Sequence, residues 1–256
     1  MAQIFCIANQ KGGVGKTTTT VNLAAGLARL NQKVLLVDLD PQGNSTMGSG
    51  IQKGELSHSV YELLLGLSDL DQAKQTSKSG GFDVLPANRN LAATEVELVD
   101  QERREYRLKD ALKQIDTEYD FILIDCPPSL SMLTINGLCA ATGVIIPMQC
   151  EYYALEGLSD LINTIGRVHS NLNKDLQIIG LLRVMYDKRI SLSQQVSAQL
   201  ERHFGDRLFK TIIPRNIRLA EAPSHGMPGI TFDSQSAGAK AYSEFAKEML
   251  NWTKRQ

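Results

Sequence analysis

A glycine-rich octet directly after a short apolar run constrains the fold of this chain more than any other feature. The octet, at residues 11–18, reads Lys-Gly-Gly-Val-Gly-Lys-Thr-Thr and follows the apolar residues 4–8. A buried strand, a glycine-rich turn and a helix that opens on Lys-Thr form the layout of a phosphate-binding loop. The N–H groups of such a loop converge on phosphate oxygens, and the positive end of the helix dipole faces them. The octet therefore predicts a strand–loop–helix unit that binds phosphate.

The octet departs from the strict pattern G-x-x-x-x-G-K-[ST] at the first position. That pattern requires glycine at position 10, where this chain has Gln10, and a second lysine, Lys11, stands at the head of the loop. Within the pattern, Lys16 is expected to reach the outer phosphates and the Thr17 hydroxyl to ligate Mg²⁺. One lysine of the loop is thus explained by the standard motif, and the other is not.

Alternation of apolar runs with helical patterns along the 256 residues predicts the fold class. It favours an α/β fold with a doubly wound, mostly parallel sheet flanked by helices, in a single domain spanning residues 1–256. The expected strands are Gln3–Ala8, Lys33–Asp38, Phe82–Leu85, Phe121–Asp125, Gly143–Met148, Ile178–Val184 and Phe209–Ile213. The expected helices are Thr17–Leu30, one beginning at a Ser59–Glu62 capping box, Arg104–Ile115, Ala154–His169, Ser191–Phe204 and Ala239–Trp252.

Charge and cysteine content narrow the function only weakly. Lysine and arginine number 27 against 28 acidic residues, so the formal net charge is −1 and any nucleic-acid surface must be local. The four cysteines show no C-x-x-C spacing, which argues against a zinc or redox centre. The sequence has no secretory signal and no stretch of about 18 apolar residues, so a reducing cytoplasm is the expected location.

Two predicted strands end in carboxylates, where ligands bind in open α/β sheets. Asp38 and Asp40 follow one strand, and Asp125 ends another. Asp40 could orient a water for attack on a γ-phosphate or hold a metal-bound water, with a turn or helix cap as the alternative. Asp38 could instead cap a helix or lie near a metal ion without ligating it. The sequence favours these roles as much as a direct role in the reaction. An acid at the position of Asp125 typically holds Mg²⁺, usually through water.

Further along the chain, three patterns bear on the ligand and on the partners. The nearest match to the guanine-reading pattern Asn-Lys-x-Asp is out of register, at Asn173-Lys174-Asp175, which favours ATP. Basic residues near turns include Arg189 and Arg218, and they are compatible with scattered surface charge or with a phosphate-backbone footprint. The last helix carries Tyr242, Phe245, Met249 and Trp252 at helical spacing, and core packing is the favoured use.

At this point the motifs identify a family. The octet with its extra lysine resembles the deviant Walker A loop of the ParA/MinD class of P-loop ATPases. Four further motifs are similar to the chromosomal ParA (Soj) branch: Asp38-Leu-Asp-Pro-Gln-Gly, Asp125-Cys-Pro-Pro-Ser, Gln149-Cys-Glu-Tyr-Tyr-Ala-Leu-Glu-Gly, and residues 213–226. The resemblance extends over nearly the whole chain, from about residue 3 to residue 250.

The resemblance implies roles for individual residues. Lys11 would cross a dimer interface to the partner's phosphates, as a lysine counterpart of an arginine finger. Asp40 would hold the attacking water, and Asp125 the water shell of the metal. Glu151 would touch the partner's ribose, while Arg189 and Arg218 would contact DNA without sequence preference. The residues expected to bind the nucleotide are Lys11, Gly12, Gly13, Val14, Gly15, Lys16, Thr17, Thr18, Glu151, Pro214 and Asn216.

The resemblance also implies a slow ATPase switch that uses ATP and Mg²⁺. The ATP-bound homodimer would hold double-stranded DNA nonspecifically and leave it when a ParB-type centromere-binding protein stimulates hydrolysis. The expected location is the cytoplasm, on the nucleoid, with no membrane contact. Because the sequence starts at the phosphate loop, an N-terminal helix-turn-helix domain is not expected. Two rivals remain: a MinD-like membrane-cycling ATPase for division-site placement, and a metal-cluster carrier.

Overall fold

The sheet at the centre of the fold is almost entirely parallel. The computed structural model describes residues 1–152 and 154–255, without the side chains of residues 154–156. Within this part of the chain, eight strands lie in the order β3-β4-β2-β5-β1-β6-β7-β8, and only β3 runs antiparallel to its neighbour. The strands are β1 (Gln3–Ile7), β2 (Val34–Asp38), β3 (Gln75–Ser77), β4 (Phe82–Leu85), β5 (Phe121–Asp125), β6 (Gly143–Gln149), β7 (Gln177–Tyr186) and β8 (Leu208–Pro214).

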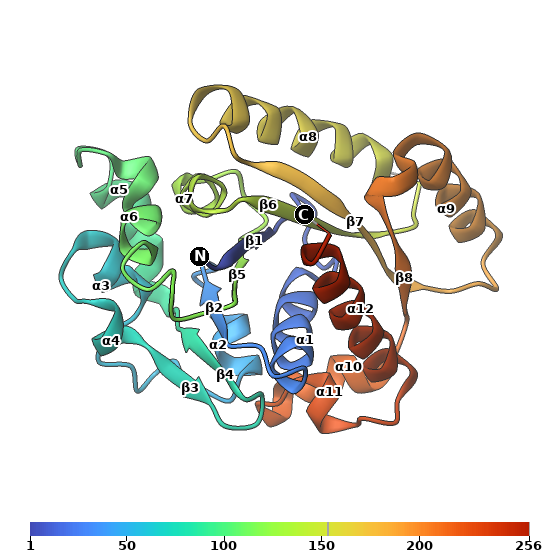
Figure 1. The fold of residues 1–256 in the computed structure, drawn as a ribbon, viewed down its shortest axis with the longest axis horizontal. Helices are drawn as coiled ribbons and strands as arrows, with labels where there is room; N and C mark the ends of the chain where they lie inside the picture. The colour runs from blue at the N-terminus through green and yellow to red at the C-terminus, as the bar shows by residue number, and fades with distance from the viewer. Residues whose placement is uncertain (153, 256) are drawn as a thin grey trace.

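Helices cover both faces of this sheet (Figure 1), which confirms the predicted doubly wound α/β fold. On one face lie α1 (Lys16–Arg29), α10 (Ile217–Glu221), α11 (Gly229–Phe232) and α12 (Ala237–Thr253). On the other lie α6 (Arg107–Leu112), α7 (Met132–Ala140), α8 (Ala154–Asn171) and α9 (Ser191–Phe204). The short helices are α2 (Asn44–Gly48), α3 (Val60–Leu65), α4 (Leu70–Ala73) and α5 (Thr94–Glu97), with 3₁₀ turns at Arg89–Ala93, Arg104–Tyr106, Gly205–Arg207 and Ala222–His225.

Strand β1 separates two hydrophobic cores. Phe5 and Ile7 point into the core beneath α1 and α12, whereas Cys6 points into the core beneath α7 and α8. In β2 and β5 every residue is buried, as expected for parallel strands that are covered on both faces. These strands are continuous apolar runs in the sequence, and their burial explains why the predicted strand positions are confirmed. For all the strands that the sequence predicts, the observed ends lie within two residues of the predicted ends.

Several elements differ from the sequence prediction, which did not include α7 or the short helices α2, α4, α5, α10 and α11. Strand β3 lies in a polar stretch with no strand pattern, because an exposed three-residue edge strand needs no apolar alternation. The helix expected over Arg104–Ile115 is divided into a 3₁₀ turn and the shorter α6. The capping box before α3 is confirmed, since Ser59 N donates to Glu62 Oε2 at 2.7 Å.

Helix α12 closes one edge of the sheet. Its side chains Tyr242, Phe245 and Met249 are buried, which confirms the predicted core packing of this helix. On the same helix, the carboxylate of Glu248 accepts hydrogen bonds from the backbone N–H groups of Lys210 (2.7 Å) and Thr211 (2.9 Å). Both amides belong to β8, the last strand of the sheet, where the register against β7 shifts. The helix therefore supplies acceptors to two β8 amides at the point where the pairing with β7 is interrupted.

Candidate nucleotide site and cationic surface

The glycine-rich octet lies at the carboxyl end of β1, where it leads directly into α1. Gly13 and Gly15 have left-handed backbone conformations, with φ of 72° and 78°. A Cβ at Gly15 would come no closer than 3.6 Å to Val184, so glycine is required there by the backbone angle and not by lack of space. Gly15 is also the N-cap of α1 and offers no side-chain cap. The first N–H groups of the helix are therefore available to an anion.

The two lysines of the loop occupy different environments. Lys16 is only 7% exposed, and its Nζ donates to the carbonyl oxygen of Lys11 at 3.1 Å. Burial lowers the pKa of Lys16, an effect that the nearby carboxylate of Asp125 opposes. The Lys11 side chain, by contrast, is 45% exposed and pairs with Glu151 at 2.7 Å between Nζ and Oε2. One lysine thus faces into the loop, while the other reaches along the surface toward the end of β6.

Asp125 is the centre of a buried hydrogen-bond network. Its Oδ2 accepts from the hydroxyls of Thr17 at 2.8 Å and Ser45 at 2.7 Å, and its Oδ1 accepts from Thr20 at 3.4 Å. Burial raises the pKa of Asp125 to about 6, while the hydrogen bonds from Ser45 and Thr17 act in the opposite direction. The structure therefore brings together the predicted pair Thr17 and Asp125. It adds Ser45 and Thr20, which the sequence analysis missed.

Asp38 lies beside Asp125 in register on the adjacent strand and is also fully buried. Its Oδ2 accepts from both the backbone N–H and the hydroxyl of Thr46, each at 2.8 Å. Burial and, second to it, the neighbouring carboxylate of Asp125 together raise the pKa of Asp38 to about 7. Of the alternatives left open for Asp38, the contacts favour the cap, because its carboxylate holds the first turn of α2 in place.

Asp40 lies between the buried carboxylates and solvent. Its Oδ1 accepts from Gln42 N at 2.9 Å, and Gly43 N donates to its carbonyl oxygen at 2.8 Å, so the residue forms the expected turn. Its second carboxylate oxygen, Oδ2, has no hydrogen-bond donor among the described residues. One carboxylate oxygen of Asp40 therefore stabilises the turn, while the other can accept a hydrogen bond from a water molecule.

A small cavity of about 100 Å³ opens next to the phosphate loop. Pro214 and Asn216, both predicted to meet the nucleotide base, line it together with Gly15 and Thr18. Asn216 caps α10 through its side-chain oxygen, which accepts from Leu219 N at 3.3 Å, so its amide nitrogen remains available. The other lining residues, which the sequence analysis did not single out for this site, are Val184, Met185, Ile213, Leu219, Ala220 and Tyr242.

Two of these additional residues have a distinctive local structure. Met185, at the end of β7, has a φ of 49°, an uncommon backbone conformation for a residue other than glycine. The Tyr242 hydroxyl lies 3.0 Å from the Thr19 hydroxyl, so α12 contacts α1 directly behind the loop. Burial raises the pKa of Tyr242. Neither residue belongs to a short motif, and only tertiary packing brings them to the cavity.

The predicted DNA contacts Arg189 and Arg218 lie outside the loop and its cavity. Arg189 is 84% exposed and forms a two-bond ion pair with Asp187. Arg218 pairs with Glu221 at 2.8 Å and lies 3.5 Å from Asp233. Both arginines follow the last two strands of the sheet, so they share one edge of the molecule. Both are already partnered by carboxylates of the same chain.

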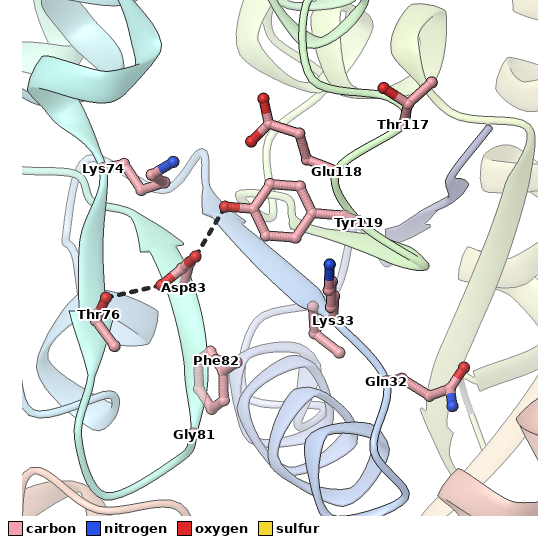
Figure 2. A pocket seen from close by; sticks show the side chains of 11 residues that line it. Gln32, Lys33, Lys74, Thr76, Gly81, Phe82, Asp83, Thr117, Glu118 and Tyr119 are labelled. Atoms are coloured by element: carbon pink, nitrogen blue, oxygen red, sulfur yellow. Dashed lines mark hydrogen bonds between the residues drawn. The ribbon is translucent and has the colours of Figure 1, made fainter.

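A cavity larger than the one beside the phosphate loop lies elsewhere in the molecule. It has a volume of about 590 Å³ and lies among residues that precede β2, β4 and β5, at the opposite end of these strands. Figure 2 shows Asp83 accepting hydrogen bonds there from Tyr119 and Thr76, each at 2.8 Å. No predicted site residue lines this cavity. The nucleotide site is therefore identified by the chemistry of its side chains and not by the size of a cavity.

Two findings bear on the rival functions. Among residues 1–152 and 154–255, the helices are too short or too polar for any of them to cross a bilayer. Over the same residues, no three His, Cys, Asp or Glu side chains gather where they could hold a metal ion. The four cysteines are buried and free, with Cys6 and Cys126 3.8 Å apart between sulfur atoms.

Comparison with known proteins places this geometry in a family. A family model described as an AAA domain matches residues 2–178. The chain is 52% identical to the sporulation initiation inhibitor protein Soj of Bacillus subtilis, over 97% of this chain and 98% of that protein. It is 49% identical to the chromosome-partitioning ATPase Soj of Treponema pallidum, over 98% of both.

A solved structure extends the agreement to three dimensions. Cobyrinic acid a,c-diamide synthase from Mycobacterium smegmatis, with bound ADP and magnesium, is 39% identical and superposes with a TM-score of 0.88. The superposition covers 99% of this chain and 96% of that one, although its name denotes another activity. The two Soj relatives are more similar in sequence than this enzyme, and the match covers nearly their whole length. The phosphate loop, the buried acidic residues and these relatives together show the family. The chain belongs to the ParA/Soj family of P-loop ATPases.

Proposed function

We propose that this protein is a partition ATPase whose ATP-bound dimer holds DNA and releases it on hydrolysis. The observation that carries the proposal is the contrast between two lysines of one loop, Lys16 buried and Lys11 at the surface. Lys16 accounts for nucleotide binding by one subunit. A second, exposed lysine has no use in that subunit's own phosphate site and is suited to the site of another subunit.

In the proposed site, residues 12–18 surround the phosphates with backbone N–H groups, and Lys16 binds the β- and γ-phosphates. The hydroxyl of Thr17 and the carboxylate of Asp125, 2.8 Å apart, form an oxygen-rich pair that fits Mg²⁺. Thr17 would ligate the ion, and Asp125 would hold its water shell. Bound Mg²⁺ would neutralise charge on the phosphates during transfer. The magnesium-bound neighbour from Mycobacterium smegmatis supports this assignment.

Hydrolysis requires a positioned water, and Asp40 is the proposed residue. One of its carboxylate oxygens is held by the turn at Gln42, which fixes the side chain. The other oxygen is free to accept a hydrogen bond from water. A carboxylate in this position orients the water and accepts its proton as the bond to phosphorus forms.

Dimerisation is proposed to change the partner of Lys11. In the single chain Lys11 pairs with Glu151, and an exposed ion pair of this kind contributes only about 0–1 kcal/mol. The lysine can therefore leave Glu151 at little cost and neutralise phosphate charge on the partner subunit. Glu151, once released, is proposed to contact the partner's ribose. Pro214 and Asn216 are proposed to meet the adenine of their own subunit.

The DNA partner is proposed to be double-stranded and bound without sequence preference, through Arg189 and Arg218. A ParB-type protein would then stimulate hydrolysis and release the dimer, in the cytoplasm and on the nucleoid. The name of the Treponema pallidum relative, a chromosome-partitioning ATPase, supports a role in partition. We further propose that residues 1–256 act as one ATPase domain.

The MinD-like alternative needs a free amphipathic C-terminal helix for a membrane surface. In α12 the residues Tyr242, Phe245 and Met249 are buried against the core, so that helix has no free apolar face for lipid. The polar side mixes Glu244 with Lys247, which pair at 2.8 Å. DNA is therefore the favoured surface partner.

One experiment tests the proposal directly. Binding to a random-sequence duplex is measured with ATP, ADP and no nucleotide, and the mass of the protein in solution is measured in parallel. The expected result is a dimer and DNA binding with ATP alone. Binding of ATP-loaded protein to anionic vesicles but not to DNA would overturn the proposal in favour of the MinD-like alternative.

A further inference from the structure

Four basic residues leave the sheet side by side at the carboxyl ends of β7 and β8. Lys188 and Arg189 follow β7, while Arg215 and Arg218 follow β8. The two loops are adjacent, because Tyr186 pairs with Pro214 and Arg215 N donates to Tyr186 O at 3.2 Å. All four side chains are exposed. We refer to these four residues as the β7–β8 cationic surface.

Carboxylates of the same chain neutralise half of this surface. Asp187 receives two hydrogen bonds from the guanidinium of Arg189, Nε to Oδ1 at 2.9 Å and Nη2 to Oδ2 at 2.7 Å. Arg218 is neutralised by Glu221 and Asp233. Lys188 and Arg215 form no ion pair with any described residue. Four cations and three carboxylates leave a formal net charge of only +1.

The pair formed by Asp187 and Arg189 uses the same geometry that would bind a phosphate. A guanidinium presents two parallel N–H groups, and these fit either a carboxylate or a phosphate. Asp187 is two residues away on the same turn, so its effective concentration at Arg189 is high. Its side chain is 17% exposed, against 84% for Arg189. The hydrogen bonds from Arg189 hold the pKa of Asp187 well below its usual range, so the carboxylate stays charged.

We propose that Asp187 masks Arg189, so that a carboxylate of the chain itself restrains binding of DNA to the β7–β8 cationic surface. This inference rests on the proposed function, which supplies DNA as the partner. A phosphate that engages Arg189 must first displace Asp187, and the displaced carboxylate then remains near the phosphates and repels them. Lys188 and Arg215 carry the charge that is free to make the first contacts. The mask lowers the affinity of each subunit, which makes binding depend on two subunits acting together.

The competing role for Asp187 is to orient Arg189 for phosphate, and one substitution separates the two roles. Asp187→Asn keeps a side-chain oxygen that can accept the turn hydrogen bond from Arg189 N, which is 3.0 Å long in the structure. It removes the charge that competes with phosphate. A mask predicts tighter DNA binding by this variant, whereas an orienting residue predicts weaker binding.

The test uses the full chain, a fluorescein-labelled random duplex and a series of salt concentrations, with ATP and with ADP. Because Arg189 contacts a phosphate in both proteins, Asp187→Asn is expected to raise the affinity for DNA while the slope of log affinity against log salt stays the same. Removal of a competing exposed ion pair worth about 0–1 kcal/mol corresponds to an affinity up to about fivefold higher. Equal or weaker binding by Asp187→Asn overturns the mask.

A matched control comes from a second two-bond pair, Arg103 with Asp110, whose Asp110 lies on α6 at the other side of the molecule (Figure 1). Asp110→Asn breaks an equivalent pair and is expected to leave DNA affinity unchanged; a matching increase would reveal a general charge effect and overturn the mask. If neither wild type nor Asp187→Asn binds DNA, the proposed DNA partner is wrong. If wild type binds and Asp187→Asn gains nothing, only the mask is wrong.

Discussion

Two groups of charged residues lie at the carboxyl edge of one sheet, and they are built on opposite principles. In the centre, Asp125 and Asp38 are fully buried, and both accept hydrogen bonds from neighbouring side-chain hydroxyls. At the side, Asp187 and Arg189 form an ion pair in which the guanidinium is largely exposed. The central group has a fixed geometry, whereas the partners in the outer group can be exchanged.

The energetic difference follows from burial. Leaving a buried polar group without its partner costs about 1–3 kcal/mol. An exposed ion pair contributes about 0–1 kcal/mol, and salt screens it. Substitutions in the buried central group should therefore abolish ATP binding or hydrolysis. Substitutions in the exposed outer group should only change the affinity for DNA. The following predictions test that contrast, from the largest expected effect to the smallest.

Lys16→Ala is expected to abolish ATP binding. The substitution removes a buried positive charge, and truncating one partner of a buried charge pair typically costs about 2–5 kcal/mol, or about 30- to 4,000-fold in affinity. Titration with a fluorescent ATP analogue measures the effect. Lys33→Ala, an exposed lysine before β2, is the control and should bind normally. Unchanged affinity in Lys16→Ala would refute the assignment of the loop.

Asp40→Ala is expected to retain ATP and to accumulate as a dimer. Loss of a residue that positions or deprotonates the attacking water lowers hydrolysis by about 10²–10⁴-fold. Phosphate release and solution mass are measured on the same sample. Asp71→Ala, at an exposed carboxylate of α4, should hydrolyse ATP at the wild-type rate. Rapid hydrolysis by Asp40→Ala would exclude the proposed role.

Arg189→Ala and Arg218→Ala should weaken DNA binding several-fold without affecting ATP-driven dimerisation. Each lost phosphate contact reduces the slope of log affinity against log salt by about 0.9. Because the contacts are to the backbone, the loss should be equal for unrelated DNA sequences. Electrophoretic or fluorescence titrations with two duplexes of different sequence measure it. A loss confined to one sequence would contradict a backbone-only contact.

Tyr242→Phe should lower the free energy of unfolding by about 1 kcal/mol, because Thr19 loses a buried hydrogen-bond partner. Tyr61→Phe is the exposed counterpart, since the Tyr61 hydroxyl donates to Glu97 at the surface at 3.0 Å. That control should change stability by less than half as much. Urea unfolding of both variants compares them, and equal losses would mean that burial does not govern the difference.

The sequence predicts the parts of the molecule that depend on local pattern. The sequence locates the buried strands because a continuous apolar run in an α/β chain is typical of a parallel strand that is covered on both faces. Lys16, Thr17 and Asp125 were assigned from motif spacing, and the structure brings Thr17 to 2.8 Å from Asp125. Strand β3 was not predicted, because an exposed strand at the edge carries no apolar alternation.

The residues that the sequence did not reveal are those placed by tertiary packing. Ser45 reaches Asp125 only because the turn at Asp40 folds α2 back over the loop. Tyr242 comes from the last helix, far along the chain from its partner Thr19. The pairing of Asp187 with Arg189 is local, yet the sequence alone could not distinguish a paired arginine from a free one.

The carboxylate of Glu248 has a consequence for how copies of this protein meet. An open sheet edge invites another chain to add a strand, which is a common route to aggregation. Here the amides of Lys210 and Thr211 are already occupied by Glu248, and the shifted register makes β8 a poor template. A protein proposed to encounter its own copies in every cycle is thereby protected at this edge from ungated association. Self-recognition is then left to the surfaces of the proposed ATP-bound dimer.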